Sequence, residues 1–155
     1  CSQQRGGPMA TNKIERFTNL GKIQHQQYEQ ALEGELKIRQ MIDDIDAALA
    51  QVRQYQQDYQ QDLLKFQQQT STTDKLLRTR KFLQQLMQME VDQLRQRQGL
   101  EQQLQHAQAE TMQRLQKSRM SDKLTKKAQV EQLAANKTLD NKQMDAIAAH
   151  RYTRR

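Results

Sequence analysis

The sequence is poor in the residues that cross-link or punctuate a compact fold. Its 155 residues include one cysteine, one proline, five glycines and no tryptophan, and only 35% of them are hydrophobic. A single cysteine excludes an intrachain disulfide framework, and the apolar content is below the roughly 45–50% of a typical globular domain. No apolar run reaches about 18 residues, so the sequence predicts no transmembrane helix. These shortages exclude a thick core and a multi-strand fold.

What the sequence does contain is a large share of helix-forming residues. Glutamine alone accounts for 31 residues, and alanine, leucine, lysine and glutamate are frequent. Since these are all good helix formers, a β protein is disfavoured and the choice narrows to long helices or disorder. Residues 1–8 precede Met9, which reads as a natural start, so we interpret them as an added or misassigned leader. The alternative is a lipid-modified Cys1.

The first half of the chain carries a regular apolar repeat. Steps of three and four residues from Ile14 to Phe66 reach sixteen positions, of which twelve are apolar or aromatic. They are Ile14, Phe17, Tyr28, Ala31, Ile38, Ile42, Ile45, Leu49, Val52, Tyr59, Leu63 and Phe66. A 3.5-residue repeat of this length is typical of a coiled coil. We therefore predict one helix over residues 12–68.

A polar segment then interrupts the repeat. Three glutamines and four hydroxyl residues occupy positions 67–73, and Ser71 has capping-box spacing to Asp74. This pattern predicts a turn over residues 69–73 and a second helix over residues 73–135. Asp140 can cap a short last helix over residues 140–150.

The second helix has a weaker apolar pattern, in which no single three-four register is apparent. Its interface is therefore expected to be polar and loosely specified. The expected inner residues are Leu76, Phe82, Leu83, Leu86, Met87, Val91, Leu94, Leu100, Leu104, Ala107, Met112, Leu115, Met120 and Leu124, followed by Met144 and Ile147 in the short last helix.

A short turn between two long helices makes them antiparallel neighbours. The predicted fold is all-α: one domain over residues 9–155, a monomeric antiparallel two-helix coiled-coil hairpin with a short C-terminal helical extension. Pairing the helices about the turn predicts three neighbouring pairs below it. These are Tyr59 with Phe82, Tyr55 with Leu86, and Val52 with Met89. The group is either coiled-coil core or a partner-binding surface, and Tyr55, which lies off the repeat, favours a surface.

The net charge of +7 lies entirely in the last part of the chain. Residues 1–113 hold 14 basic and 14 acidic residues, whereas residues 114–155 hold 11 basic and four acidic ones. Such asymmetry indicates an acidic partner, nucleic acid or a membrane surface, or simply a solvated helix face. Nucleic-acid binding is disfavoured because Tyr152 is the only aromatic residue in this region.

Nothing in the sequence indicates catalysis. His25, His106 and His150 lie far apart, there is no phosphate-binding glycine loop, and no clustered ligands suggest a metal. We therefore predict a protein that is not an enzyme and needs no cofactor.

Two segments resemble one known family. They are Gln54-Tyr55-Gln56-Gln57-Asp58-Tyr59 followed by Leu63, and Leu139-Asp140-Asn141-Lys142-Gln143-Met144-Asp145 followed by Ile147-Ala148. Together with the glutamine-rich composition and the central turn, they make the chain from Met9 to Arg155 similar to the flagellar export protein FliJ family and its virulence-secretion counterparts. The closing motif favours the flagellar branch.

The resemblance implies a cytoplasmic stalk at the inner membrane, peripheral to it and not inserted. Such a stalk is similar in shape to the central shaft of rotary ATPases. Its open end would enter the pore of the hexameric export ATPase, and its other part would reach the cytoplasmic region of the export gate; it would also handle export chaperones. The implied gate-binding residues are Val52, Tyr55, Tyr59, Phe82, Leu86 and Met89.

For the ATPase ring, we expect basic residues of the second helix to make the contact. They are Arg114, Lys117, Arg119, Lys123, Lys126 and Lys127. The alternative function is a generic coiled-coil adaptor or chaperone escort without an ATPase partner, which predicts stable homo-oligomers. A nucleic-acid-binding helical protein would instead show salt-sensitive affinity carried by residues 114–155.

Overall fold

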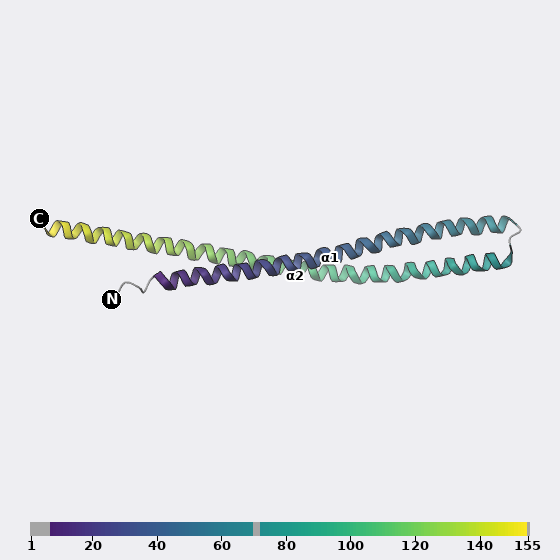
Figure 1. Cartoon of the computed structure of the whole chain (residues 1–155), viewed down its shortest axis with the longest axis horizontal. Coiled ribbons are helices and arrows are strands. Elements are labelled where there is room, and N and C mark those ends of the chain that lie inside the picture. Colours follow the sequence, from purple (N-terminus) through teal and green to yellow (C-terminus); the bar gives the residue numbers. More distant parts are fainter. Residues whose placement is uncertain (1–6, 70–71, 155) are drawn as a thin grey trace. The chain divides into compact units, whose positions relative to one another are not determined.

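Two long helices make up the chain. A computed structural model describes residues 7–69 and 72–154, and side chains from Asn12 onward. Helix α1 spans Gly7–Gln68 and helix α2 spans Thr73–Thr153 (Figure 1). The predicted all-helical hairpin is therefore confirmed, and the first helix ends and the second begins at the predicted residues.

Hydrogen bonds at the turn explain these two helix ends. The amide of Gln69 donates to the Lys65 carbonyl at 3.1 Å, which closes α1. The Thr72 carbonyl accepts from the amides of Lys75 (3.0 Å) and Leu76 (3.4 Å), which opens α2. Asp74 lies in the first turn of α2, where a carboxylate is favoured by the helix dipole. The other half of the predicted capping box, Ser71, lies outside the described residues.

The helix bounds differ from the prediction at both remote ends. Helix α1 begins at Gly7, within the segment we interpret as a leader, and Pro8 is tolerated there because it lies in the first turn. Helix α2 continues without a break through residues 135–140, so the separate helix over residues 140–150 is wrong. The physical reason is that no glycine or proline follows Gly99, and an aspartate inside a helix costs well under about 1 kcal/mol.

The described residues form two compact units, although the sequence suggested a single domain. One unit contains the turn and covers residues 31–110, and we call it the turn unit. The other combines residues 7–30 of α1 with residues 111–154 of α2, and we call it the terminal unit. Within each unit, a stretch of α1 packs against an antiparallel stretch of α2.

Helix α1 buries the seam that its sequence predicts. All sixteen positions of the three-four repeat from Ile14 to Phe66 are buried or half-buried. Ile42, Leu49 and Val52 are the most buried of them. Burial of the apolar surface on this stripe is the main stabilising term for a helix of this kind. Each Å² removed from water contributes about 25 cal/mol to the free energy of folding.

Helix α2 also follows a strict three-four register, so the expectation that no single register holds is wrong, whereas the expected polar character of its interface is confirmed. Its seam runs unbroken from Leu76 to Gln132 at buried or half-buried positions. The positions are Leu76, Thr79, Leu83, Leu86, Glu90, Gln93, Arg97, Leu100, Leu104, Ala107, Thr111, Arg114, Ser118, Ser121, Thr125, Ala128 and Gln132. The register was hidden because polar and small residues hold many of its places.

Consequently, several large apolar residues that the sequence assigned to the interface lie at the surface. Each of the following is more than a third exposed: Phe82, Met87, Val91, Leu94, Met112, Met120, Leu124, Met144 and Ile147. A helix with a single neighbour can cover only a narrow stripe, and these residues fall outside that stripe.

In the terminal unit, small residues let the two helices approach closely. A Cβ atom placed on Gly21 would lie 3.9 Å from the Cβ atom of Ser121. The buried hydroxyl of Ser121 donates to the carbonyl of Lys117 (3.1 Å), and the Thr125 hydroxyl donates to the carbonyl of Ser121 (3.0 Å). These polar side chains therefore satisfy their hydrogen bonds within α2 and can be buried at little cost.

The burial pattern predicts where substitutions destabilise the turn unit. Leu86 is 3% exposed, so Leu86→Ala should lower the free energy of unfolding by about 2–4 kcal/mol. Met87→Ala, on the exposed side of the same helical turn, should change it by less than about 0.5 kcal/mol. Denaturant melts followed by circular dichroism would measure both, and equal effects would contradict the observed seam.

Candidate functional site

The residues expected to bind the export gate lie in the turn unit, and two of them belong to its core. Val52 and Leu86 are both almost fully buried in the seam. The Tyr59 ring packs against the Phe82 ring with centroids 4.7 Å apart and planes tilted by 49°. The contact predicted between these two aromatic residues is therefore confirmed, and it fixes how α1 and α2 pair near the turn.

One edge of the turn unit is closed by ion pairs. Arg53 donates from Nε to Oε1 of Glu90 at 2.8 Å, and Gln56 donates from Nε2 to Oε2 of Glu90 at 2.9 Å. The hydrogen bonds from Arg53 and Gln56, with the charge of Arg53, hold the pKa of the Glu90 carboxyl below its usual value. Glu90 is thus a seam position that stays ionised because both of its oxygens are satisfied.

A second ion cluster continues this edge. Arg97 donates from Nε to Asp46 Oδ1 at 2.6 Å and also bonds the carboxylate of Glu101. The hydrogen bond to Asp46 and the two negative charges raise the pKa of the Arg97 guanidinium above its ordinary value. Asp46 and Glu101 each follow a seam residue, so the positions after the seam on both helices share one edge. We call it the charged edge.

The opposite edge consists of the positions that directly precede every second seam residue, namely each seam residue that is reached by the step of four. Reversing one helix in a coiled coil brings these positions of both helices to the same side. In the turn unit they include Met41, Tyr55, Phe82 and Met89, which are all between 41% and 51% exposed. We call this side the apolar edge. The Tyr55 hydroxyl accepts a hydrogen bond from Gln51 Nε2 at 3.1 Å, which orients its ring along α1.

A shallow groove hollows the apolar edge farther from the turn. Met41, Ile45 and Leu100 supply its apolar lining, and Gln96 and Gln103 form part of its rim. Gly99 also lines it, and apart from its chain neighbours and the backbone of its own helix no atom lies within 4 Å of where its Cβ would be. The groove therefore widens where a glycine replaces a side chain.

The structure thus divides the six residues implied for gate binding into three groups by their exposure. Val52 and Leu86 are core, and Tyr59 is half-buried between core and surface. Tyr55, Phe82 and Met89 lie on the apolar edge and can reach a partner. Their role in binding stays a prediction. The sequence reading missed the groove residues, although counting the positions just before each seam residue would have found Met41.

The basic residues expected to face the ATPase ring lie in the terminal unit but do not form one cluster. Arg114 is half-buried in the seam, where its Nη1 donates to Gln27 Oε1 at 2.8 Å. Lys117 precedes the seam residue Ser118, on the same edge as an ion pair between Lys13 and Glu131 (3.8 Å). The other four share an outward face of α2 at helical spacing. They are Arg119, Lys123, Lys126 and Lys127, all exposed.

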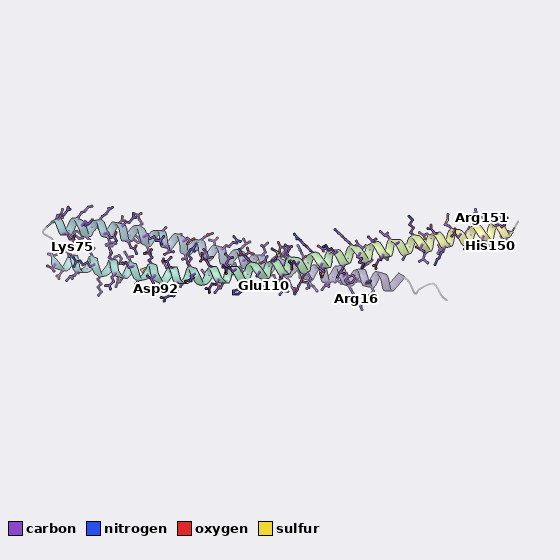
Figure 2. All side chains as sticks on the ribbon, turned by 180° about the vertical axis from the view of Figure 1, so that it is seen from behind. Arg16, Lys75, Asp92, Glu110, His150 and Arg151 are labelled. Carbon is purple, nitrogen blue, oxygen red and sulfur yellow. The ribbon has the colours of Figure 1, made fainter. Side chains whose placement is uncertain are left out.

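Beyond Gln132, α2 has no covering helix within the terminal unit. Every described residue from Leu133 to Arg154 is exposed. Figure 2 shows His150 and Arg151 on this stretch, with no second ribbon beside it, while Arg16 lies on the stretch of α1 in the same unit. Met144, Ile147 and Tyr152 form a bare apolar stripe there, next to Arg151.

The described part of the chain holds neither a membrane-spanning helix nor a cluster of metal ligands. Neither helix, as far as it is described, contains a stretch apolar and long enough to span a bilayer. Within the same ranges, histidine, cysteine, aspartate and glutamate side chains do not gather in groups of three or more that could hold a metal ion.

A helical hairpin with an exposed apolar edge and exposed basic residues belongs to the class of coiled-coil proteins. The family described as "Flagellar FliJ protein" matches residues 12–155, and the chain belongs to this family. No curated protein and no solved structure matches the chain. The family is a non-enzymatic component of flagellar protein export, and its members associate with the export apparatus.

The geometry around Glu90 predicts a pH dependence of stability. Because its pKa is lower in the folded chain, the stabilisation is present above the unfolded-state pKa of about 4.3 and is lost as the pH falls through the folded value. Glu90→Gln should therefore lose less stability than the parent between about pH 5 and pH 3. Asp43→Asn, which removes an exposed carboxylate, serves as the control. Parallel pH profiles for the parent and Glu90→Gln in urea melts would contradict the effect.

Proposed function

We propose that this protein is the non-enzymatic central stalk of a flagellar type III export apparatus. It promotes assembly and turnover of the hexameric export ATPase and links that ring to the export gate and to export chaperones. Family membership supports the export role. The observation that carries the finer proposal is the separation of two surfaces: an apolar edge in the turn unit and a basic face in the terminal unit.

The terminal unit is suited to contact a ring of subunits. The α2 side of its seam is made mainly of small and polar residues, and its outward face carries Arg119, Lys123, Lys126 and Lys127. Exposed ion pairs are individually worth only about 0–1 kcal/mol, so such a face can meet successive subunits without locking onto one. Such weak contacts suit a stalk that must not lock onto one subunit of the ATPase ring.

The turn unit is suited to hold a partner more firmly. Tyr55, Phe82 and Met89 expose apolar surface beside a rigid core, and aromatic and methionine side chains are enriched in interface cores. We propose that this edge contacts the cytoplasmic region of the export gate. The protein would then work at the cytoplasmic face of the membrane, peripheral to it.

The decisive experiment is ATP turnover by the purified cognate export ATPase, measured with and without this chain, together with an assay of hexamer formation. The stalk proposal expects turnover and the hexamer fraction to rise together. Analytical ultracentrifugation should show the isolated chain as a monomer. No effect on the ATPase, combined with a stable homo-oligomer, would replace the stalk proposal with the coiled-coil adaptor.

Charge reversal tests the basic face. The triple variant Arg119→Glu, Lys123→Glu and Lys126→Glu should weaken ATPase stimulation severalfold, because it removes the positive charges that would meet the ring. The matched control, Arg78→Glu, Arg80→Glu and Lys81→Glu, reverses three exposed charges in the turn unit and should leave stimulation unchanged. Circular dichroism should show equal helix content for both. Full stimulation by the first triple variant would refute the role of this face.

Tyrosine truncation tests the apolar edge. Tyr55→Ala should weaken binding of the purified gate region about tenfold, the size of a moderate hot spot. Tyr152→Ala removes an even more exposed tyrosine from the terminal unit and should leave gate binding unchanged. Calorimetric titration would measure both affinities. If the two variants bind alike, the exposed ring of Tyr55 is not part of a gate-binding surface.

A further inference from the structure

The apolar edge carries a repeating arrangement of carboxylates. Met41, Tyr55 and Met89 are each followed, three residues later, by an aspartate. Residues three apart are neighbours on a helix surface, so each carboxylate flanks its apolar residue on the side away from the seam. The three are Asp44, Asp58 and Asp92, and all are exposed.

These aspartates are held in place but not neutralised. Asp44 accepts from Gln40 Nε2 (3.0 Å), and Asp58 accepts from Gln54 Nε2 (3.1 Å). In the same way, Gln88 Nε2 donates to Asp92 at 3.1 Å. Each glutamine lies four residues earlier on the same helix, and none of the three carboxylates has an ion-pair partner among the described residues.

The charged edge of the same unit is arranged differently. There, Glu90 is bonded by Arg53, while Asp46 and Glu101 are bonded by Arg97. Acidic residues on that edge are thus satisfied by the chain itself, whereas those flanking the apolar edge keep their charge available. Electrostatic complementarity then favours a positively charged partner on the apolar edge alone.

The spacing of the edge indicates the shape of the partner. On α1 the edge positions Met41, Ala48 and Tyr55 recur every seven residues, as do Phe82 and Met89 on α2. Seven residues of helix rise about 10.5 Å, which is also the repeat with which another coiled-coil helix presents its apolar positions. An apolar edge of this period fits a third helix better than an extended peptide.

We infer that the apolar edge of the turn unit binds a cationic amphipathic helix, with its apolar stripe on Met41, Tyr55 and Met89 and its flanking Lys or Arg residues on Asp44, Asp58 and Asp92. The inference rests on the proposed docking of a partner at this edge, and it specifies the chemistry of the segment that docks. It also extends the surface beyond the six residues implied by the family, as far as the groove lined by Leu100.

Two synthetic helical peptides of 21 residues test this chemistry on the full chain. Both carry the same heptad leucine stripe, and one bears lysines and the other glutamates on the positions that flank the stripe. The chain has a net charge of +7, so non-specific attraction would favour the glutamate peptide. Tighter binding of the lysine peptide, by anisotropy at about 0.1 M salt, is the expected result; equal or tighter binding of the glutamate peptide would overturn the inference.

Paired substitutions locate the binding. Asp58→Asn with Asp92→Asn should weaken the lysine peptide about three- to tenfold, because two exposed charge pairs are lost. Glu33→Gln with Asp43→Asn removes the same charge from positions of the turn unit away from the edge, and should have no effect. Equal effects of the two pairs would place the peptide elsewhere and overturn the inference.

The outcome is separable from that of the proposed function. The peptide assay contains neither the ATPase nor the gate, so lysine-peptide selectivity can be found whether or not the chain stimulates ATP turnover. If the chain stimulates the ATPase and binds the gate but shows no selectivity, only the cationic-helix inference fails. If selectivity is found without either activity, the stalk function fails and the docking chemistry stands.

Discussion

A helix with one neighbour can hide only one narrow stripe of its surface, and this limit governs the whole molecule. The three-four seam of each helix packs against the other helix, and the side chains outside the seam contact solvent or a partner. That is why Met89 is half exposed although Leu86, three residues away, is buried. It is also why polar residues such as Glu90 and Arg97 can occupy seam positions: their charged ends reach the edge, where they find partners, while their stems contribute to packing.

The two units use the seam in different ways. In the turn unit, Ile42, Leu49 and Val52 provide branched apolar side chains, so the pairing of the helices is firm and the exposed residues beside it are held on a rigid base. In the terminal unit, Ser118 and Ser121 provide little apolar area, and stability must come from close approach. A firm surface suits the proposed docking partner, and one with little buried apolar area suits the proposed contact with the ATPase ring.

The sequence predicted α1 well because large apolar residues occupy most positions of its seam, so the 3.5-residue repeat can be recognised directly. It also predicted the contact of Tyr59 with Phe82, because a short turn leaves little freedom in how two helices pair. It failed on α2, where Thr79, Ser118 and Ser121 are buried while Met120 and Leu124 are not. Hydrophobicity alone ranks a small polar side chain as exposed and a large apolar one as buried. It therefore misses a small side chain that is covered because the two helices lie close together. The charged edge and the apolar edge were likewise not predicted, because they can be assigned only once the seam positions of both helices are known.

The hydroxyls of Ser121 and Thr125 bond to carbonyls of their own helix and to nothing across the seam. Unzipping the terminal unit at these positions would therefore break no hydrogen bond between the helices, and it would expose little apolar surface to water. The free energy needed to separate the two helices at these positions is correspondingly low. A partner that binds the terminal unit could thus separate its two helices locally while the aliphatic seam near the turn stays packed.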